Sequence, residues 1–113
     1  MRAWAEAVRA GDYDTADDLF AVPATIANVG PKLRVRKRAD IDAFNRSLPC
    51  GAEVTDTQVA GGGYLRVTFT LVPGRDGTPC MGDAQVSFRI VDGHITEWLR
   101  EDGQPENPDA RET

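Results

Sequence analysis

The sequence has few of the residues from which metal sites and disulfide-rich scaffolds are built. Its 113 residues include one histidine and two cysteines, Cys50 and Cys80. A structural zinc site normally requires four cysteine or histidine ligands, so we expect no metal site. We expect the two cysteines to be reduced thiols, as is usual inside cells, with a disulfide between them as the alternative.

Long apolar runs and an excess of positive charge are also missing. No segment approaches the roughly 18 apolar residues of a membrane span, and the N-terminal stretch, interrupted by Glu6 and Arg9, does not resemble a signal peptide. The formal net charge of −5 disfavours binding to nucleic-acid phosphates and to anionic membrane surfaces. We therefore expect a cytoplasmic protein without a nucleic-acid or membrane partner, and we expect no cofactor.

What the sequence does contain is the ordinary composition of a globular domain, with 41% hydrophobic and 27% charged residues. A chain of this length forms one domain and buries enough surface to fold without cross-links. We place the domain at residues 1–101. The polar, proline-containing residues 102–113 are expected to form a disordered tail.

The first half of the chain predicts helices. Residues 3–10 have helical spacing, and Gly11 is a natural stop because glycine adopts the left-handed conformation at no steric cost. Asp12 fits the N-cap of a second short helix that ends before Pro23. A third helix is predicted within residues 38–48, where one apolar face is formed by Ile41, Phe44 and Leu48.

The remaining segments alternate between apolar and polar residues as β-strands do. The glycines at 61–63 and the pair Asp92-Gly93 supply the positive φ angles of tight hairpins. This order predicts an α+β fold, in which about three helices from the N-terminal half pack on the concave face of a curved, mixed, mainly antiparallel sheet. The expected strands are 24–29, 32–38, 52–60, 64–72, 83–91 and 94–100.

A resemblance to the cone-shaped nuclear-transport-factor-2-like superfamily rests on this order and on four segments. They are AGDYDTADDLFA (10–21), ATIANVG (24–30), IDAFNRSLP (41–49) and FRIVDGHITEW (88–98). The superfamily includes SnoaL-like polyketide cyclases, ketosteroid isomerases and limonene-epoxide hydrolases, and the resemblance spans about residues 1–101. It implies a bent sheet wrapped round helices that encloses an apolar pocket, usually in a dimer.

The positions that would carry ketosteroid isomerase catalysis are changed. By the resemblance, Asn28 replaces the catalytic aspartate, Trp4 the oxyanion-hole tyrosine, and approximately Val86 the second, protonated aspartate. An amide accepts no proton at neutral pH, an indole N–H is a poorer donor than a phenol, and valine donates nothing. We therefore expect no ketosteroid isomerase activity. The Asp–Arg–Asp set of limonene-epoxide hydrolases is also not found on the inward face of the strands.

Glu97 is the one candidate for a catalytic base. Simple alternation within 94–100 places it on the same face as Ile95 and Leu99, where burial would raise the pKa of its carboxyl group. SnoaL-like sequences often have a glutamate near this point of the last strand. The alternatives, which we favour, are a β-bulge that turns Glu97 outward and Trp98 inward, or a place at the solvated rim of the pocket.

Aromatic residues and polar strand residues define two further candidate sites. We expect a ligand pocket, although aromatics at these spacings more often form a plain core, and Asn28 would serve either a ligand or the backbone. We expect a homodimer face on the opposite side of the main strands. The pocket residues are Trp4, Asn28, Phe44, Phe69, Phe88 and Trp98, and those of the dimer face are Arg66, Thr68, Thr70, Gln85, Ser87 and Arg89.

The leading functional hypothesis is a small cytoplasmic domain whose pocket binds a small apolar or amphipathic molecule. One alternative is a SnoaL-like cyclase or isomerase that moves a proton on a polyketide-like carbonyl compound, with Glu97 as the base. The other is a dimerisation or partner-binding module whose own aromatics fill the pocket. The fold by itself cannot separate these, because the superfamily hosts all three kinds of protein.

Overall fold

The computed structural model describes residues 1–74 and 76–100 of the chain. The predicted tail, residues 102–113, lies outside this range. One turn of 3₁₀ helix, η1 (Gly61–Gly63), joins the third and fourth strands. The elements follow in the order α1 (Arg2–Ala10), α2 (Tyr13–Asp18), β1 (Phe20–Asn28), β2 (Leu33–Val35), α3 (Arg38–Ser47), β3 (Gly51–Ala60), β4 (Tyr64–Val72), β5 (Asp83–Val91) and β6 (His94–Arg100).

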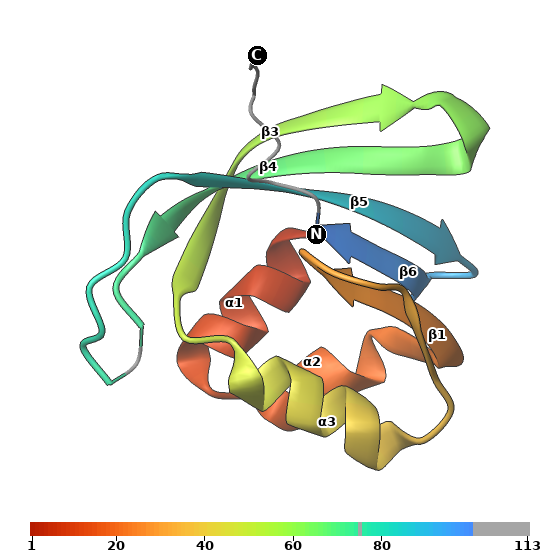
Figure 1. The fold of residues 1–113 in the computed structure, drawn as a ribbon, viewed down its shortest axis with the longest axis horizontal. Helices are drawn as coiled ribbons and strands as arrows, with labels where there is room; N and C mark the ends of the chain where they lie inside the picture. The colour runs from red at the N-terminus through yellow and green to blue at the C-terminus, as the bar shows by residue number, and fades with distance from the viewer. Residues whose placement is uncertain (75, 101–113) are drawn as a thin grey trace.

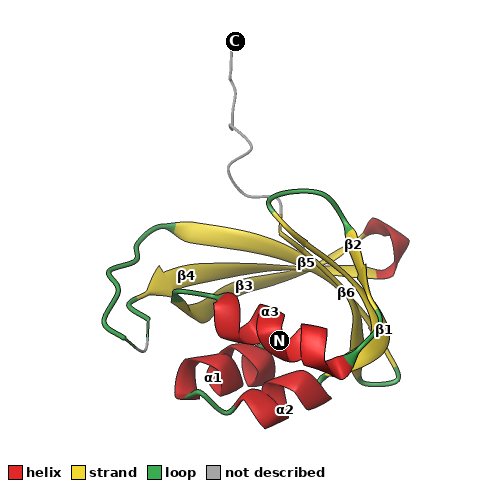
Figure 2. Ribbon diagram, turned by 60° about the horizontal axis from the view of Figure 1, so that its bottom comes forward, coloured by secondary structure: helices red, strands yellow, loops and turns green. Residues whose placement is uncertain are grey.

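The strands form one six-stranded sheet in the order β2-β1-β6-β5-β4-β3. Neighbouring strands are antiparallel except β1 and β6, which run parallel. The sheet curls without closing, and the helices pack together against its concave face (Figures 1 and 2). The predicted α+β cone with a mixed, mainly antiparallel sheet is therefore confirmed.

The first two helices are separated where the sequence indicated. Gly11 ends α1 with a φ of 76°, and the Asp12 carboxylate accepts hydrogen bonds from the backbone N–H and the hydroxyl of Thr15. One boundary differs, because β1 begins at Phe20 and not near residue 24. The N–H of Ile95 donates to the carbonyl of Leu19, so pairing with β6 draws this stretch into the sheet despite its helical spacing.

Both predicted glycine turns are present. Asp92 and Gly93 have φ angles of 52° and 79°, as a two-residue hairpin between β5 and β6 requires. Gly62 and Gly63, in η1 between β3 and β4, have φ angles of 76° and 81°. These turns bring strands that are adjacent in the sequence side by side, and they fix which residues face the helices.

The core lies between α1 and the concave face of the sheet. Trp4 is 4% exposed and makes edge-to-face contacts with three other rings, at centroid distances of 6.0 Å to Phe69, 6.0 Å to Phe88 and 5.7 Å to Trp98. Val67 and Val86, from the two central strands, are also buried. Helix α1 therefore docks on the sheet through one tryptophan surrounded by aromatic side chains.

Cys50 and Cys80 form a disulfide, with their Cα atoms 5.9 Å apart, so the expectation of two reduced thiols is wrong. The antiparallel pairing of β3 with β4 places Gly51 opposite Val72 and brings the start of β3 to the loop that follows β4. In that loop, the Cα of Gly74 approaches the carbonyl of Pro49 so closely that a side chain there would collide with it. The loop between β4 and β5 is thus held against the segment that connects α3 to β3.

Candidate functional site

An apolar cavity of about 230 Å³ lies between the concave face of the sheet and the segment that follows α3. Its wall is contributed by α1, by the connection from α3 to β3, and by strands β3 to β6. Arg100 at the end of β6 is its one charged lining residue among those described. The lining residues are Trp4, Leu48, Pro49, Cys50, Ala52, Phe69, Leu71, Ala84, Val86, Trp98 and Arg100.

Three of the six predicted pocket residues, Trp4, Phe69 and Trp98, line this cavity. Phe88 belongs to the fully buried core, and Phe44 packs edge-on against Trp98 with ring centroids 4.8 Å apart. Neither of these two phenylalanines is part of the cavity wall. The aromatic residues are therefore divided between core and cavity.

Asn28 does not line the cavity either. It is exposed at the last position of β1, and the chain turns directly after it, at Val29, whose φ is positive. Its alternation with Ile26 would place it on the inward face, but Ile26 is buried whereas Asn28 is exposed. The amide therefore lies outside the cavity that the structure contains.

The cavity residues that the sequence analysis missed are mostly small or aliphatic. Leu71, Ala84 and Val86 share strand parity with Phe69 and Phe88, so the same alternation pattern would have found them. Leu48, Pro49 and Cys50 become wall residues only through the tertiary position of the connection after α3. Arg100 has the same strand parity as Trp98, and both face the cavity because of the bulge that precedes them in β6.

Strand β6 places Glu97 on the outer face of the sheet. The pairing of β5 with β6 shifts register between Arg89 and Ile90, because Arg89 pairs with Glu97 while Ile90 pairs with Ile95. This bulge turns Trp98 inward, where it is 2% exposed, and Glu97 outward. The bulge that the sequence analysis favoured over simple alternation is confirmed.

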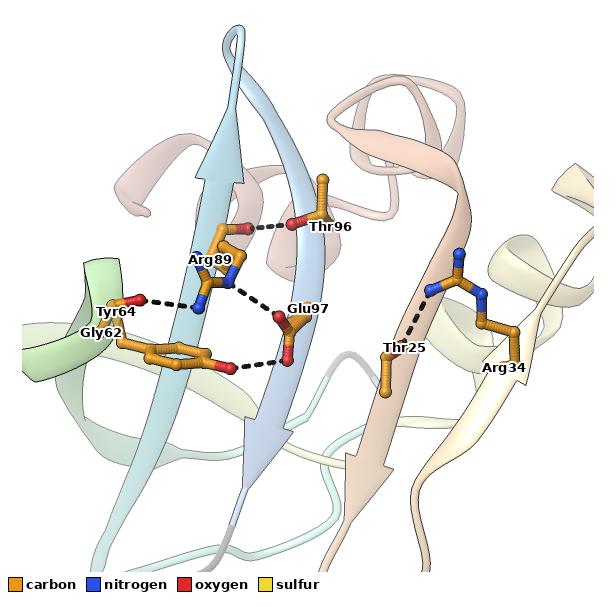
Figure 3. A network of polar contacts seen from close by, with 7 residues as sticks. All are labelled: Thr25, Arg34, Gly62, Tyr64, Arg89, Thr96 and Glu97. Carbon is orange, nitrogen blue, oxygen red and sulfur yellow. Dashed lines mark hydrogen bonds and ion pairs between the residues drawn. The ribbon is translucent and has the colours of Figure 1, made fainter.

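Glu97 is held in a network on that outer face (Figure 3). The hydroxyl of Tyr64 donates to Oε1 of Glu97 at 2.9 Å, and Nε of Arg89 donates to Oε2 at 2.8 Å. Arg89 also donates from Nη2 to the carbonyl of Gly62, and its guanidinium lies 4.4 Å from the centre of the Tyr64 ring. Both carboxylate oxygens are therefore engaged, on the side of the sheet away from the cavity.

A buried polar chain anchors Trp4 from the helical side. Its indole Nε1 donates to Oδ1 of Asn45 at 2.9 Å, and Nδ2 of Asn45 donates to Oδ1 of Asp17 at 2.8 Å. Asn45 is fully buried and Asp17 is 3% exposed. Burial raises the pKa of Asp17, and the hydrogen bond with the carboxyl group of Asp42 raises it further.

The pKa of Asp42 moves in the opposite direction. Its hydrogen bonds with Asp17 and with Arg46 lower it, and Nε of Arg46 lies 2.6 Å from Oδ2 of Asp42. In this pair, Asp17 thus holds the proton more tightly and Asp42 carries the negative charge. Neither carboxyl group lines the apolar cavity.

A second, more polar cavity of about 390 Å³ adjoins the first and shares Leu48, Pro49 and Cys50 with it. Its arginines, Arg9 and Arg46, already have carboxylate partners in Glu53 and Asp42. Because its charges are paired by the protein itself and one side lies along the exposed loop after β4, the apolar cavity is the better candidate for a ligand site.

The six predicted dimer residues lie together on the outer face. Strand β4 presents Arg66, Thr68 and Thr70, and strand β5 presents Gln85, Ser87 and Arg89 beside them. Arg66 is opposite Ser87, and Thr68 is opposite Gln85, whose side-chain amide donates to the threonine hydroxyl at 3.3 Å. The two strands thus form a continuous patch of short polar and cationic side chains.

A curled α+β sheet over three helices, with an apolar cavity between them, defines a protein of the nuclear-transport-factor-2-like class. Within that class the chain belongs to the SnoaL-like domain family, whose model matches residues 1–98. No curated protein matches the chain at a significant level. Solved structures do match, and they agree with the family in fold.

A proposed polyketide cyclase from Sinorhizobium meliloti superposes with a TM-score of 0.68 at 20% identity, over 87% of this chain and 89% of that one. A proposed ketosteroid isomerase from Kribbella flavida gives a TM-score of 0.66 at 19% identity, with 88% and 71% covered. An NTF2-like protein of unknown function from Cytophaga hutchinsonii gives 0.68 at 10% identity, with 87% and 81% covered. At these identities the likeness shows the fold alone.

Within residues 1–74 and 76–100, no cluster of three or more histidine, cysteine, aspartate or glutamate side chains has the arrangement to hold a metal ion. In the same residues, every helix is too short or too polar to cross a bilayer.

Proposed function

We propose that this SnoaL-like domain binds a small apolar or amphipathic molecule in the 230 Å³ cavity and does not transfer protons on it. The observation that carries the proposal is the composition of the wall. Among the described residues that form it, none is Asp, Glu, His or Tyr. A general base must come within hydrogen-bond reach of its substrate, so this wall supports binding and not acid–base chemistry.

The enzymatic alternative depends on a carboxylate that reaches the cavity. Glu97 lies on the outer face of the sheet, with both oxygens bonded to Tyr64 and Arg89. Asp17 is bonded to Asn45, is buried among the helices, and is absent from the cavity wall. Each candidate base is thus separated from the space where a substrate would lie.

The alternative of a filled pocket is also weaker than binding. Phe44 and Phe88 occupy the core around Trp98, yet they leave the volume beside Trp4 and Phe69 open. Apolar cavities of this kind take up apolar ligands, because the wall atoms otherwise lack contact partners. The open volume therefore favours a ligand over a purely structural module.

Titration of the ¹⁵N-labelled protein with 3-phenylpropan-1-ol, followed by NMR, tests this proposal. We expect chemical-shift changes concentrated at cavity residues such as Ala52, Phe69 and Ala84. The substitution Ala84→Leu should fill the cavity and abolish these changes, whereas Ala3→Leu, on the exposed face of α1, should leave them intact. Ala52→Leu is a second filling variant if Ala84→Leu loses its dispersed spectrum. Shifts that persist in both filled variants, or none in the wild type, would contradict the proposal.

We also propose that the polar patch on β4 and β5 forms a homodimer interface. Paired rows of threonine, serine and glutamine give much of this sheet face short polar side chains, which suits the packing of one sheet on another. Sedimentation velocity of the wild type and of Ser87→Arg tests this. The new arginine would lie opposite Arg66, so we expect a wild-type dimer that the substitution dissociates. A wild type that sediments as a monomer at all concentrations would refute it.

The cytoplasmic location remains a prediction. The Cys50–Cys80 disulfide favours an oxidising compartment instead, because cytoplasmic thiols are normally kept reduced. Trapping of free thiols at the moment of cell lysis, followed by intact-mass measurement, distinguishes the two: two alkylated cysteines support the cytoplasm and none supports an oxidising compartment.

A further inference from the structure

Among the described side chains, one buried polar atom has no hydrogen-bond partner, and it belongs to a residue of the cavity wall. This atom is the indole Nε1 of Trp98, a residue that is 2% exposed and lines the apolar cavity. The other indole of the wall differs, because Nε1 of Trp4 donates to Asn45. Buried polar groups nearly always have a partner, so an unpaired donor indicates a missing acceptor.

The aromatic residues packed around Trp98 do not supply this acceptor. Its ring makes edge-on contacts with the rings of Trp4, Phe44 and Phe88, whose side chains contain no hydrogen-bond acceptor. The buried amide of Asn45 already accepts a hydrogen bond from Trp4. An acceptor for Trp98 would therefore lie in the cavity, and a bound molecule would bring it.

The rest of the wall limits the size and the charge of what can fit. Phe69, Leu71 and Val86 line the cavity with hydrocarbon, and no side chain of the described wall contains an oxygen. The volume of about 230 Å³ is below the roughly 300–1,000 Å³ typical of sites for drug-sized ligands, which suits a single ring or a short chain. The one charged residue of the described wall, Arg100, already has an interaction within the protein. Because burying a further charge costs free energy unless that charge is paired, the wall favours a neutral molecule.

We propose that Trp98 orients the ligand, and that the ligand is a small neutral molecule whose carbonyl or ether oxygen accepts a hydrogen bond from Nε1. This rests on the proposed function, because it assigns the chemical class of the molecule in the same cavity. One acceptor oxygen satisfies the indole donor without adding a second polar group that the wall would leave unpaired. The apolar body of the ligand, one ring or a short chain, then lies against Phe69 and Val86.

A matched pair of probes, acetophenone and its isostere 2-phenylpropene, tests the inference by NMR titration. The two molecules have nearly the same shape, but the second has a CH₂ group in place of the carbonyl oxygen. Because the hydrocarbon is also the more hydrophobic of the two, the quantity compared between proteins is the ratio of the two dissociation constants. Trp98→Phe removes the donor, so we expect it to weaken acetophenone relative to 2-phenylpropene by about 10-fold, the scale of one buried hydrogen bond left unmade.

A control variant and a measurement on the wild type complete the test. Leu71→Ala changes the same wall without removing a donor, so it should alter both affinities by the same factor. In the wild type, the indole Nε1–H resonance of Trp98, assigned by through-bond correlations, should move further downfield with acetophenone than with 2-phenylpropene. That of Trp4, already bonded to Asn45, should respond equally to the two probes.

An unchanged affinity ratio in Trp98→Phe, or a Trp98 resonance that responds equally to both probes, would overturn the inference and leave the proposed function standing. Failure of both probes and of 3-phenylpropan-1-ol to bind would overturn the proposed function as well.

Discussion

Trp4 and Trp98 lie in edge-to-face contact. Of their two indole N–H groups, that of Trp4 donates a hydrogen bond, whereas that of Trp98 has no acceptor among the described residues. Asn45 accepts from the indole of Trp4 and donates to Asp17, so each member of this buried chain satisfies the next. The sequence predicted that Trp4 would be buried but held no sign of its partner, since Asn45 is 41 residues away on α3. The identity of a buried hydrogen-bond partner depends on helix packing, which local periodicity does not report.

The carboxyl group of Asp17 makes the stability of the protein depend on pH. Burial and the hydrogen bond with Asp42 raise its folded-state pKa above the ordinary value for aspartate, about 3.9. Between the ordinary pKa, which applies to the unfolded state, and the raised pKa of the folded state, the folded protein binds more protons than the unfolded protein. The free energy of unfolding therefore falls as the pH rises through this window. The lowered pKa of Asp42 changes the free energy of unfolding only below about pH 4, which is outside this window.

We therefore predict that Asp17→Asn, which keeps a donor and an acceptor but no charge, removes this loss of stability. Urea unfolding of the wild type and the variant from pH 4 to pH 7 measures it. The free energy of unfolding of the wild type should decline relative to that of Asp17→Asn as the pH rises. Asp12→Asn, at an exposed helix cap, provides the control for a general charge effect. Two curves that run parallel for wild type and Asp17→Asn would show that Asp17 does not titrate in this window.

At the scale of the elements, one row of side chains crosses the outer face of five strands. Tyr64 on β4 pairs with Arg89 on β5, which pairs with Glu97 on β6. Glu97 is next to Thr25 on β1, whose hydroxyl accepts a hydrogen bond from Arg34 on β2 (Figure 3). A slip of one residue between any two of these strands would break the row, so the network favours the observed register.

Glu97→Gln tests whether Glu97 has this structural role or a catalytic one. The Arg89–Glu97 pair is partly buried, with side-chain exposures of 36% and 21%, so we expect a loss of about 1 kcal/mol in the free energy of unfolding. Binding of 3-phenylpropan-1-ol should not change, because Glu97 lies outside the cavity wall. Glu53→Gln breaks the more exposed pair with Arg9 and should cost no more than about 0.5 kcal/mol. Probe affinity that changes with Glu97→Gln would contradict the assignment.

Alternation and turn residues predicted where the strands of this sheet lie in the sequence better than they predicted which face of the sheet each side chain is on. The period-two patterns of β4 and β5 and the Asp92-Gly93 turn were sufficient, because each is local. The orientation of Glu97 and Trp98 was not fixed by alternation alone, since the bulge in β6 reverses the faces of all later residues. Arg100 enters the cavity wall for this reason.

For the whole molecule, order and spacing of the elements indicated the fold, whereas the cavity required the tertiary structure. Leu48, Pro49 and Cys50 form one wall because the chain after α3 is held there by the loop beyond β4. No local pattern between Cys50 and Cys80 in the sequence predicts the contact between the segment after α3 and the loop after β4. It arises from the pairing of two long strands, β3 and β4, which lie between the two cysteines.

The disulfide acts on the molecule as a whole, because the 30-residue span from Cys50 to Cys80 includes β3 and β4, two of the six strands. A cross-link of this span restricts the unfolded chain and contributes about 2–4 kcal/mol to folding stability. We predict a loss of this size in the free energy of unfolding when the bond is reduced with a phosphine. The double variant Cys50→Ser, Cys80→Ser should show the lower stability from the start and no response to the phosphine.

Because Cys50 also lines the cavity, the same samples should bind 3-phenylpropan-1-ol more weakly. Equal stability of the oxidised and reduced proteins would mean that the strand pairing alone holds this part of the sheet together.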